Sequence, residues 1–298
     1  MPRNRSVRIR LVGALLLLAG AAVASAQDTS PCVRDADTAC LLDGRFDVGV
    51  VWTTTEASGE ARVMSFLGER AESDQSAFYW FFDPANFEMG VKMVDACVPP
   101  FDAFWVFVSG LTNQGYALRV RDSTTGAVKI YENPLGSYPQ TVGDTSAFAC
   151  AGTEIDAAPA PPPALAPTPR SEEAAAGPCV ADASTACLLG GRFEARVTWL
   201  TAEATGSGGV MSFGAARAES DQSAFYWFFD PANFEMGVKM VDACVPPFDA
   251  FWVFVSGLTN QGYTLEVRDS VTGAVRVYEN PLGSYPQTVG DTSAFPCI

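Results

Sequence analysis

The apolar residues of this chain recur at every second position rather than at every third or fourth. In residues 87–94 they alternate with more polar neighbours, and residues 45–52 begin with the same alternation. This spacing predicts β-strands with one buried face. Residues 77–82 and 104–108 are instead apolar at nearly every position, which is typical of strands that are covered on both faces of their sheet.

The pattern occurs twice along the chain. Residues 70–116 are identical to residues 217–263, and each cysteine of the first half has a counterpart 147 residues further on. Each copy has the usual size of an autonomous domain. The sequence therefore predicts two domains of the same fold, at residues 27–150 and 179–298.

Turn-forming residues separate the strands within each copy. Residues 123–126 (Ser-Thr-Thr-Gly) lie between two strand-like segments and predict a β-hairpin, and residues 83–86 and 133–136 are turns by composition. We expect seven or eight short strands and no helix in each copy. The predicted fold class is all-β, with two tandem antiparallel β-sandwiches, because each sheet has one face to bury; a barrel remains an alternative.

The segments outside the two copies have compositions of their own. Residues 1–26 combine four arginines, an apolar run and Ala24-Ser25-Ala26, which together predict a secretory signal peptide. Residues 151–178 are rich in proline and alanine, and predict a disordered, extended linker between two independent domains. No later segment is apolar over the roughly 18 residues of a membrane-spanning helix. We expect a secreted protein, extracellular or periplasmic.

The net charge and the absence of histidine narrow the range of possible functions. The chain has no histidine, which removes the commonest general base and nearly all catalytic zinc sites. Its net charge is −15, and loss of the four arginines of residues 1–26 leaves 15 basic and 34 acidic residues, a net charge of −19. Such a chain repels nucleic acid and anionic lipid headgroups. We expect no cofactor, no metal ion and no nucleic-acid partner.

Eight cysteines in an exported chain indicate disulfides. Four cysteines in each copy allow three pairings. The short separation of the first two favours one small loop and one long loop in each copy: Cys32–Cys40 with Cys97–Cys150, and Cys179–Cys187 with Cys244–Cys297.

Several motifs together resemble a β-rich module of secreted bacterial proteins. They are Cys-x7-Cys-Leu-x2-Gly-Arg-Phe at 32–46, Trp-Phe-Phe-x-Pro-x-Asn-x-Glu at 80–88, Phe-Trp-Val-Phe-x2-Gly-Leu-Thr-Asn at 104–113 and Asp-Thr-x-Ala-Phe at 144–148. Ala96 stands where this module usually has glycine. The resemblance implies an extracellular all-β module and assigns it no activity and no catalytic residue.

The aromatic residues are the main candidates for a binding site. Four tryptophans in the apolar strands are a candidate ligand platform, although the pattern favours a place in the core: Trp80, Trp105, Trp227 and Trp252. Glu88 and Lys92 lie on one face of their strand, which we expect to be exposed to solvent.

The carboxylates offer a weaker signal. Asp95, Asp122 and Asp144 fall near strand ends, where aspartates commonly form turns and could gather around calcium, but no calcium-loop motif is present. The sequence favours a non-enzymatic binding or structural module whose ligand is a glycan, a protein or another extracellular surface. The alternative is a hydrolase that uses two carboxylates.

Overall fold

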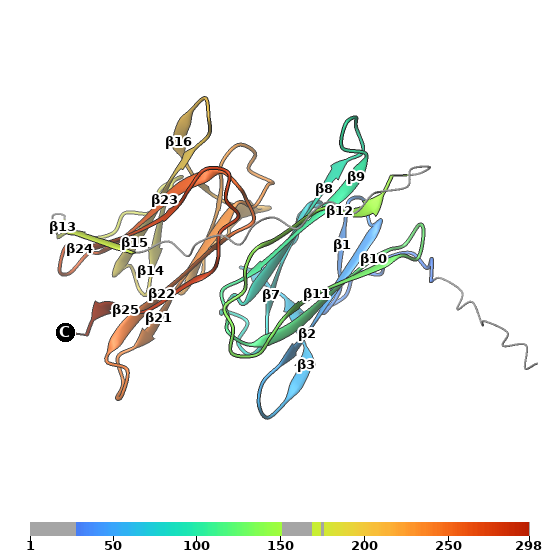
Figure 1. Ribbon diagram of the computed structural model, residues 1–298. Helices are drawn as coiled ribbons and strands as arrows, with labels where there is room; N and C mark the ends of the chain where they lie inside the picture. Colours follow the sequence, from blue (N-terminus) through green and yellow to red (C-terminus); the bar gives the residue numbers. More distant parts are fainter. Residues whose placement is uncertain (1–27, 151–168, 174–175, 298) are drawn as a thin grey trace, which may run out of the picture.

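A computed structural model describes residues 28–150, 169–173 and 176–297 (Figure 1). The predicted signal peptide and most of the predicted linker lie outside the described residues. No helix in the described part of the chain is long and apolar enough to cross a membrane. We call residues 28–150 unit 1 and residues 169–297 unit 2.

Unit 1 is an antiparallel β-sandwich. One sheet has the order β1-β2-β10-β11 with β3 paired to β2, the other has the order β12-β9-β8-β7-β4, and β5 and β6 form a small ribbon. The strands are β1 (Ala39–Leu41), β2 (Phe46–Thr53), β3 (Ser58–Glu60), β4 (Arg62–Val63), β5 (Ser65–Phe66), β6 (Glu69–Arg70), β7 (Ser76–Trp80), β8 (Met89–Ala96), β9 (Ala103–Gly110), β10 (Gly115–Asp122), β11 (Val128–Asn133) and β12 (Val142–Ala149).

Unit 2 repeats this arrangement. Its sheets have the orders β13-β24-β23-β15-β14, with β16 paired to β15, and β17-β20-β21-β22-β25, and β18 pairs with β19. The strands are β13 (Arg170–Glu173), β14 (Thr185–Leu188), β15 (Phe193–Leu200), β16 (Thr205–Ser207), β17 (Gly209–Val210), β18 (Ser212–Phe213), β19 (Ala216–Arg217), β20 (Ser223–Trp227), β21 (Met236–Ala243), β22 (Ala250–Gly257), β23 (Gly262–Asp269), β24 (Ala274–Asn280) and β25 (Val289–Pro296).

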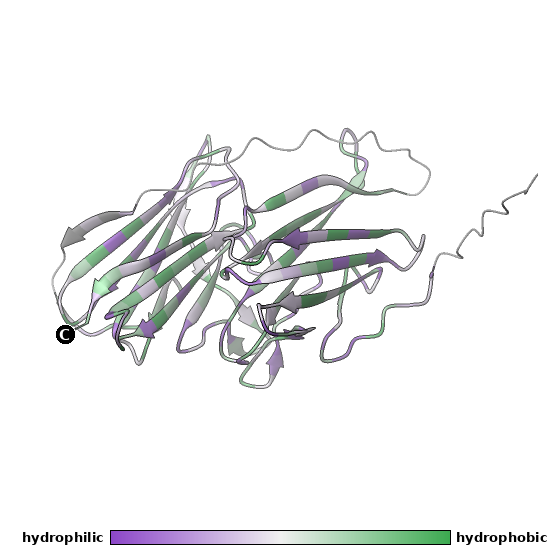
Figure 2. Ribbon diagram, turned by 60° about the horizontal axis from the view of Figure 1, so that its bottom comes forward, coloured by the Kyte–Doolittle hydropathy of each residue, from purple (hydrophilic) through white to green (hydrophobic). Residues whose placement is uncertain are grey.

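The predicted fold class is confirmed, and the alternation of polar and apolar residues is visible as bands along the strands (Figure 2). Between the two sheets of unit 1, Phe46, Val48 and Val50 of β2 are buried at alternate positions. The buried Tyr79 hydroxyl donates a hydrogen bond of 2.8 Å to the Val48 carbonyl, so its polar end is satisfied. Unit 2 contains the same bond, from Tyr226 to Ala195.

The disulfides tie the ends of each unit to its sheets. Cys32 is bonded to Cys40 and Cys97 to Cys150, with Cα–Cα distances of 5.9 and 5.7 Å. The second unit has the equivalent bridges, Cys179–Cys187 and Cys244–Cys297. These are the pairings that the loop lengths favour. Four disulfides indicate that the protein folds in an oxidising compartment outside the cytoplasm.

Two features differ from the sequence-based expectation. Each unit has more strands than the seven or eight expected, because several strands have only two or three residues and are too short to show a period. The end of the predicted linker is also ordered: Arg170–Glu173 forms β13, which pairs with β24 at the edge of unit 2.

The two units share a third apolar core, which contradicts the prediction of independent domains. The second face of the β4–β7–β8–β9–β12 sheet packs against the same face of unit 2, so the molecule has four layers of sheet (Figure 1). We call this cluster the inter-unit core. It contains Met64, Phe66, Ala71, Phe78, Phe87, Phe107 and Leu111 of unit 1 and Met211, Phe213, Ala216, Ala218, Phe225, Phe234, Phe254 and Leu258 of unit 2.

This interface has two-fold symmetry within one chain. Four residues contact their own counterparts 147 positions away: Phe66 stacks on Phe213, Phe78 packs on Phe225 at 4.7 Å between ring centroids, Ser109 hydrogen-bonds to Ser256, and Gln140 pairs with Gln287. Off the axis the contacts are reciprocal. Thr141 donates to the Gly257 carbonyl at 2.7 Å and Thr288 to the Gly110 carbonyl at 2.6 Å. Self-pairing of one patch is the signature of a two-fold homodimer interface.

We therefore expect unit 2 alone, as residues 169–298, to form a homodimer. The apolar patch around Phe225 and Phe254 would otherwise face water, and the residues that cover it from unit 1 are of the same types in unit 2, apart from Glu69, which aligns with Ala216. Sedimentation velocity checks the mass of the particle. The Phe225→Asp variant, which places two carboxylates against each other on the axis, is expected to abolish the dimer. A folded unit 2 that remains monomeric at tens of micromolar would contradict this assignment.

Candidate binding surface

The four candidate tryptophans lie at the margin of the inter-unit core. Trp80 on β7, Trp105 on β9 and their counterparts Trp227 and Trp252 are partly buried and pack against that cluster. The Arg62 guanidinium lies 5.8 Å from the centre of the Trp80 ring. In each unit both indoles lie on the sheet face that packs against the other unit.

The aromatic run that contains Trp80 is divided between three environments. Tyr79 and Phe81 are buried in the core of unit 1, as the alternation of a strand requires, whereas Phe78 points to the other face and into the inter-unit core. Phe82 is half exposed and lies 4.9 Å from Trp52 in an edge-to-face contact. The core interpretation is correct for most of the run, but one of the two cores is shared with unit 2.

The most exposed apolar groups near these tryptophans lie at two hairpin turns. We call residues 98–102, between β8 and β9, tip 1, and residues 245–249, between β21 and β22, tip 2. Val98 and Phe101 are 61% and 54% exposed, and their counterparts Val245 and Phe248 are 59% and 54% exposed. Two prolines lie between the exposed residues in each tip. Because proline fixes its own backbone angle, the tips lose little conformational freedom on binding.

Each tip is held firmly at its base. The Cys97–Cys150 disulfide joins the start of tip 1 to the end of β12, and Asp95 accepts a hydrogen bond of 2.9 Å from the Cys97 amide. Phe101 packs edge-to-face on Trp105 at 5.1 Å. A series of rings then continues from Trp105 to Phe107 and on to Tyr285 of unit 2. The exposed rings are therefore continuous with the packed interface.

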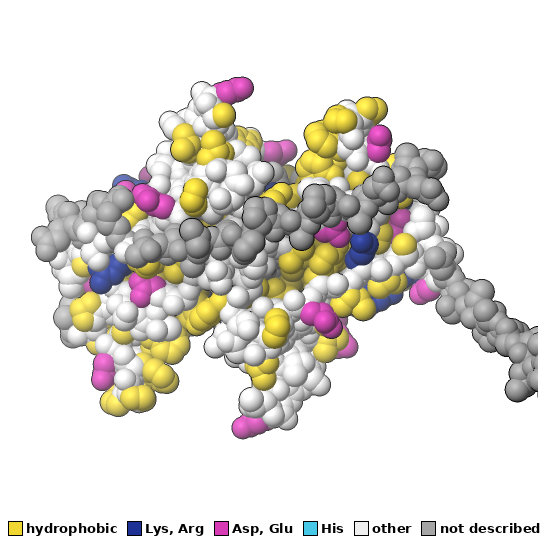
Figure 3. All heavy atoms as spheres, viewed as in Figure 1, with side chains coloured by type: hydrophobic (Ala, Val, Ile, Leu, Met, Phe, Trp, Pro, Cys, Tyr) yellow, Lys and Arg dark blue, Asp and Glu magenta, His cyan; other side chains and the backbone are white. Residues whose placement is uncertain are grey.

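The two-fold arrangement directs the tips to opposite ends of the molecule. Figure 1 shows the β8–β9 turn at the top right and the β21–β22 turn at the bottom left. Hydrophobic side chains gather at both places on the molecular surface (Figure 3). Sequence reasoning missed these tips because apolar residues were assigned to strands. The available signal was Val-Pro-Pro-Phe in a turn, where exposed apolar residues commonly mark interaction sites.

Glu88 and Lys92 are buried, so the expectation of an exposed face was wrong. Both side chains are covered by unit 2, and each pairs across the interface rather than with the other. The Lys92 Nζ lies 3.5 Å from Glu235 Oε1, and the Lys239 Nζ lies 3.8 Å from Glu88 Oε1. Lys239 also donates to the Phe87 carbonyl at 3.1 Å. Alternation alone placed these charges correctly on one face, but it could not reveal that a second sheet covers that face.

Burial disfavours the charged forms of Lys92, Lys239 and Glu88. Removal from water lowers the pKa of Lys92 and of Lys239, while the facing carboxylates act in the opposite direction. Burial also raises the pKa of Glu88, against the attraction of Lys239. The Lys92–Glu235 and Lys239–Glu88 pairs are satisfied only when the two units are in contact, so they add specificity to an interface that is otherwise apolar.

The three aspartates near strand ends have separate structural roles. Asp122 forms an ion pair with Arg45 at 2.8 Å, Asp144 accepts from the Tyr131 hydroxyl at 3.0 Å, and Asp95 caps the end of β8 as described above. The described residues contain no group of three or more side chains placed to hold a metal ion.

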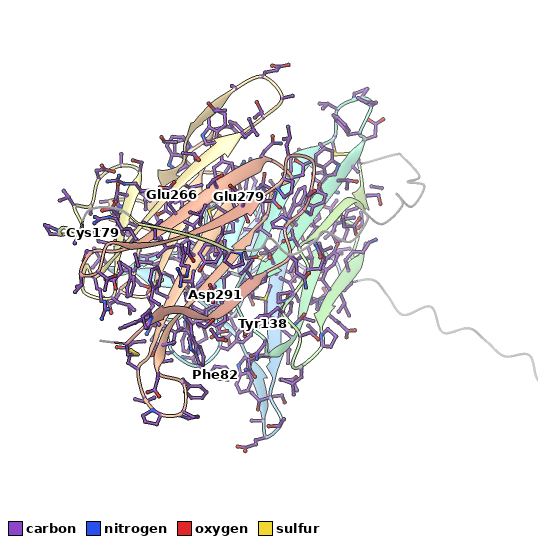
Figure 4. All side chains as sticks on the ribbon, turned by 60° about the vertical axis from the view of Figure 1, so that its left-hand side comes forward. Phe82, Tyr138, Cys179, Glu266, Glu279 and Asp291 are labelled. Carbon is purple, nitrogen blue, oxygen red and sulfur yellow. A yellow bond between two sulfur atoms is a disulfide. The ribbon has the colours of Figure 1, made fainter. Side chains whose placement is uncertain are left out.

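One hollow of about 440 Å³ lies on the outer face of unit 2. Its Glu194 carboxylate is engaged by two arginines, Arg196 at 3.1 Å and Arg268 at 2.6 Å. Glu266, which also lines it, projects from β23 on the same outer face (Figure 4). Both carboxylate oxygens of Glu194 are thus occupied by arginine side chains. The geometry therefore offers little support for the hydrolase alternative.

Comparison of the chain with protein-family models, with curated proteins and with solved structures finds no match in any of the three. The function of the chain is therefore inferred from its own geometry.

The buried ion pairs give a direct test of the interface. Lys92→Met leaves the Glu235 carboxylate buried without its cation, and we expect a loss of about 3–5 kcal/mol in the free energy of unfolding. The Lys92→Met/Glu235→Gln double variant removes both charges and should recover most of that loss. Lys129→Met is the matched control, because Lys129 pairs with Asp144 at 3.6 Å at a half-exposed site and should cost under about 1 kcal/mol. The free energies of unfolding are measured by urea denaturation. Equal losses in Lys92→Met and Lys129→Met would show that the Lys92 site is not buried.

Proposed function

We propose that this is a secreted, non-enzymatic binding protein that bridges two partners through tips 1 and 2. The observation that carries the proposal is the pair of exposed apolar tips, related by two-fold symmetry and directed away from each other. The four disulfides and the predicted signal peptide support a role outside the cytoplasm.

A protein surface is the partner that fits the tips best. Phenylalanine, valine and proline present aliphatic and aromatic carbon, which buries well in a hydrophobic pocket of another protein. A sugar-binding site would combine an aromatic face with several polar groups directed at hydroxyls. The strongly acidic chain also disfavours nucleic acid and anionic membranes as partners.

The opposed tips favour bridging over binding to one flat surface. A flexible linker would allow two independent domains to bind neighbouring sites on the same surface and gain avidity. With the units packed against each other, the separation of the tips is fixed by the interface. A single flat surface that contacts one tip then leaves the other tip free for a second partner.

We expect Phe101→Asp/Phe248→Asp to abolish binding without unfolding the protein. A charge cannot be buried in an apolar pocket, and a central contact of this kind typically contributes 2 kcal/mol or more, roughly 30-fold in affinity. The probe is an array of extracellular matrix proteins and glycans, and the melting temperature reports folding. Val33→Asp/Leu67→Asp is the matched control, because it adds the same charges at exposed apolar positions outside the tips. Unchanged binding by the tip variant would refute the proposal, and selective binding to glycans would refute a protein partner.

Agglutination of coated beads tests whether the protein bridges two partners. Beads coated with a protein identified on the array should agglutinate with the intact protein. A variant with one altered tip should still bind to single beads but no longer agglutinate them. Agglutination by Phe101→Asp alone, as efficient as that by the unaltered protein, would exclude tip 1 as one of the two bridging sites.

A further inference from the structure

The two units differ at one edge of their outer sheets. In unit 2 the edge strand β24 is covered by β13, with Arg170, Ser171, Glu172 and Glu173 opposite Val277, Arg276, Val275 and Ala274. The Ser171 hydroxyl accepts a hydrogen bond of 2.7 Å from Arg276. A short segment of the linker thus completes this sheet.

In unit 1 the equivalent strand β11 has a neighbour on one side only. Among the described residues it pairs with β10 and with no other strand. Val128 and Ile130 are 44% and 60% exposed, whereas Val275 and Val277 at the equivalent positions are 6% and 1% exposed. The two edges have nearly the same sequence, Ala127-Val-Lys-Ile and Ala274-Val-Arg-Val. Within the described part of the chain, an edge that is able to accept a strand is therefore open in unit 1.

The described residues supply one additional strand, β13, for two such edges. Residues 23–26, which precede unit 1 at the positions equivalent to β13, belong to the predicted signal peptide. The β13 strand of every chain is occupied by its own β24. A second copy of this chain can offer its β13 to β11 only by opening its own β24 edge, so exchange between copies gives no net gain in pairing.

We propose that the open edge of β11 binds an extended segment of another protein by antiparallel strand addition. This interaction is separate from the tips and goes beyond the proposed function. Unpaired main-chain groups of an edge strand supply the affinity, and side chains along the edge supply the preference. In the register of β13 on β24, an acidic or hydroxyl residue of the partner would lie opposite Lys129, in the place that Ser171 has opposite Arg276.

Lys129 selects the charge of the incoming strand. It lies at the middle of the edge and is half exposed, with Asp144 at 3.6 Å. A lysine in this place disfavours pairing of two β11 edges with each other, because the two cations would approach closely. An acidic residue in the added strand would neutralise it. The preferred partner is an extended segment with an acidic or hydroxyl residue in the place of Ser171.

Disulfide trapping tests the site and its register. The probe is a synthetic peptide of residues 166–176, which contains the strand that pairs with β24, carrying cysteine in place of Ser171. All eight native cysteines are paired, so Lys129→Cys introduces the one free thiol. Directly opposed residues of antiparallel strands are within disulfide distance. We expect cross-linking to be at least about 10-fold faster than with a peptide that carries its cysteine at position 170.

The equivalent variant in unit 2 is the matched control. Arg276→Cys occupies the same place on an edge that β13 already covers, and we expect it to react slowly with the same peptide. In the Ser171→Pro/Glu172→Pro background, which disrupts β13, that control should become reactive. Equal rates at Lys129→Cys and Arg276→Cys, or no dependence on the position of the peptide cysteine, would overturn the proposal. The tip variants provide a separate check, because Phe101→Asp/Phe248→Asp should leave trapping at β11 unchanged.

Discussion

The strands β7 and β9 are apolar on both faces, and this double-sided character determines the rest of the molecule. One face of their sheet fills the core of the unit with residues such as Tyr79 and Val91. The other presents Phe78 and Phe107, beside Phe87 of the β7–β8 connection, and would expose a large apolar patch if nothing covered it. The second copy covers it with the same residues. Burial of this second face converts two similar domains into one body, and the linker is not needed to position them.

The symmetry of that burial accounts for features that have no explanation in a single unit. Two lysines and two glutamates are buried without an oppositely charged partner in their own unit, and each finds one across the axis. The same axis sends the two apolar tips to opposite ends and leaves identical turns available to two partners. The asymmetry comes from the segment before each unit: β13 closes the edge of unit 2, while β11 remains open in the described part of unit 1.

Local sequence was sufficient for the longer strands and the cysteine pairs, because a period of two and loop lengths are local properties. It was insufficient where the burial of a residue depends on what covers that face of its sheet. Phe78 and Tyr79 are adjacent and equally apolar, yet they enter different cores. Glu88 and Lys92 have the pattern of a solvated face but lie beneath another sheet. Arg170–Glu173 has no strand-forming residue, and its pairing follows from the open edge beside it rather than from its own preference.

The central claim is that the interface, and not the linker, holds the two units together. The most direct measurement inserts a site for a sequence-specific protease between residues 157 and 166, cleaves the folded protein there, and follows the halves by sedimentation velocity. Dilution to the low micromolar range should leave both halves in one particle of unchanged mass, because the inter-unit core and the ion pairs remain intact. Separation of the cleaved protein into two folded monomers at that concentration would contradict the account.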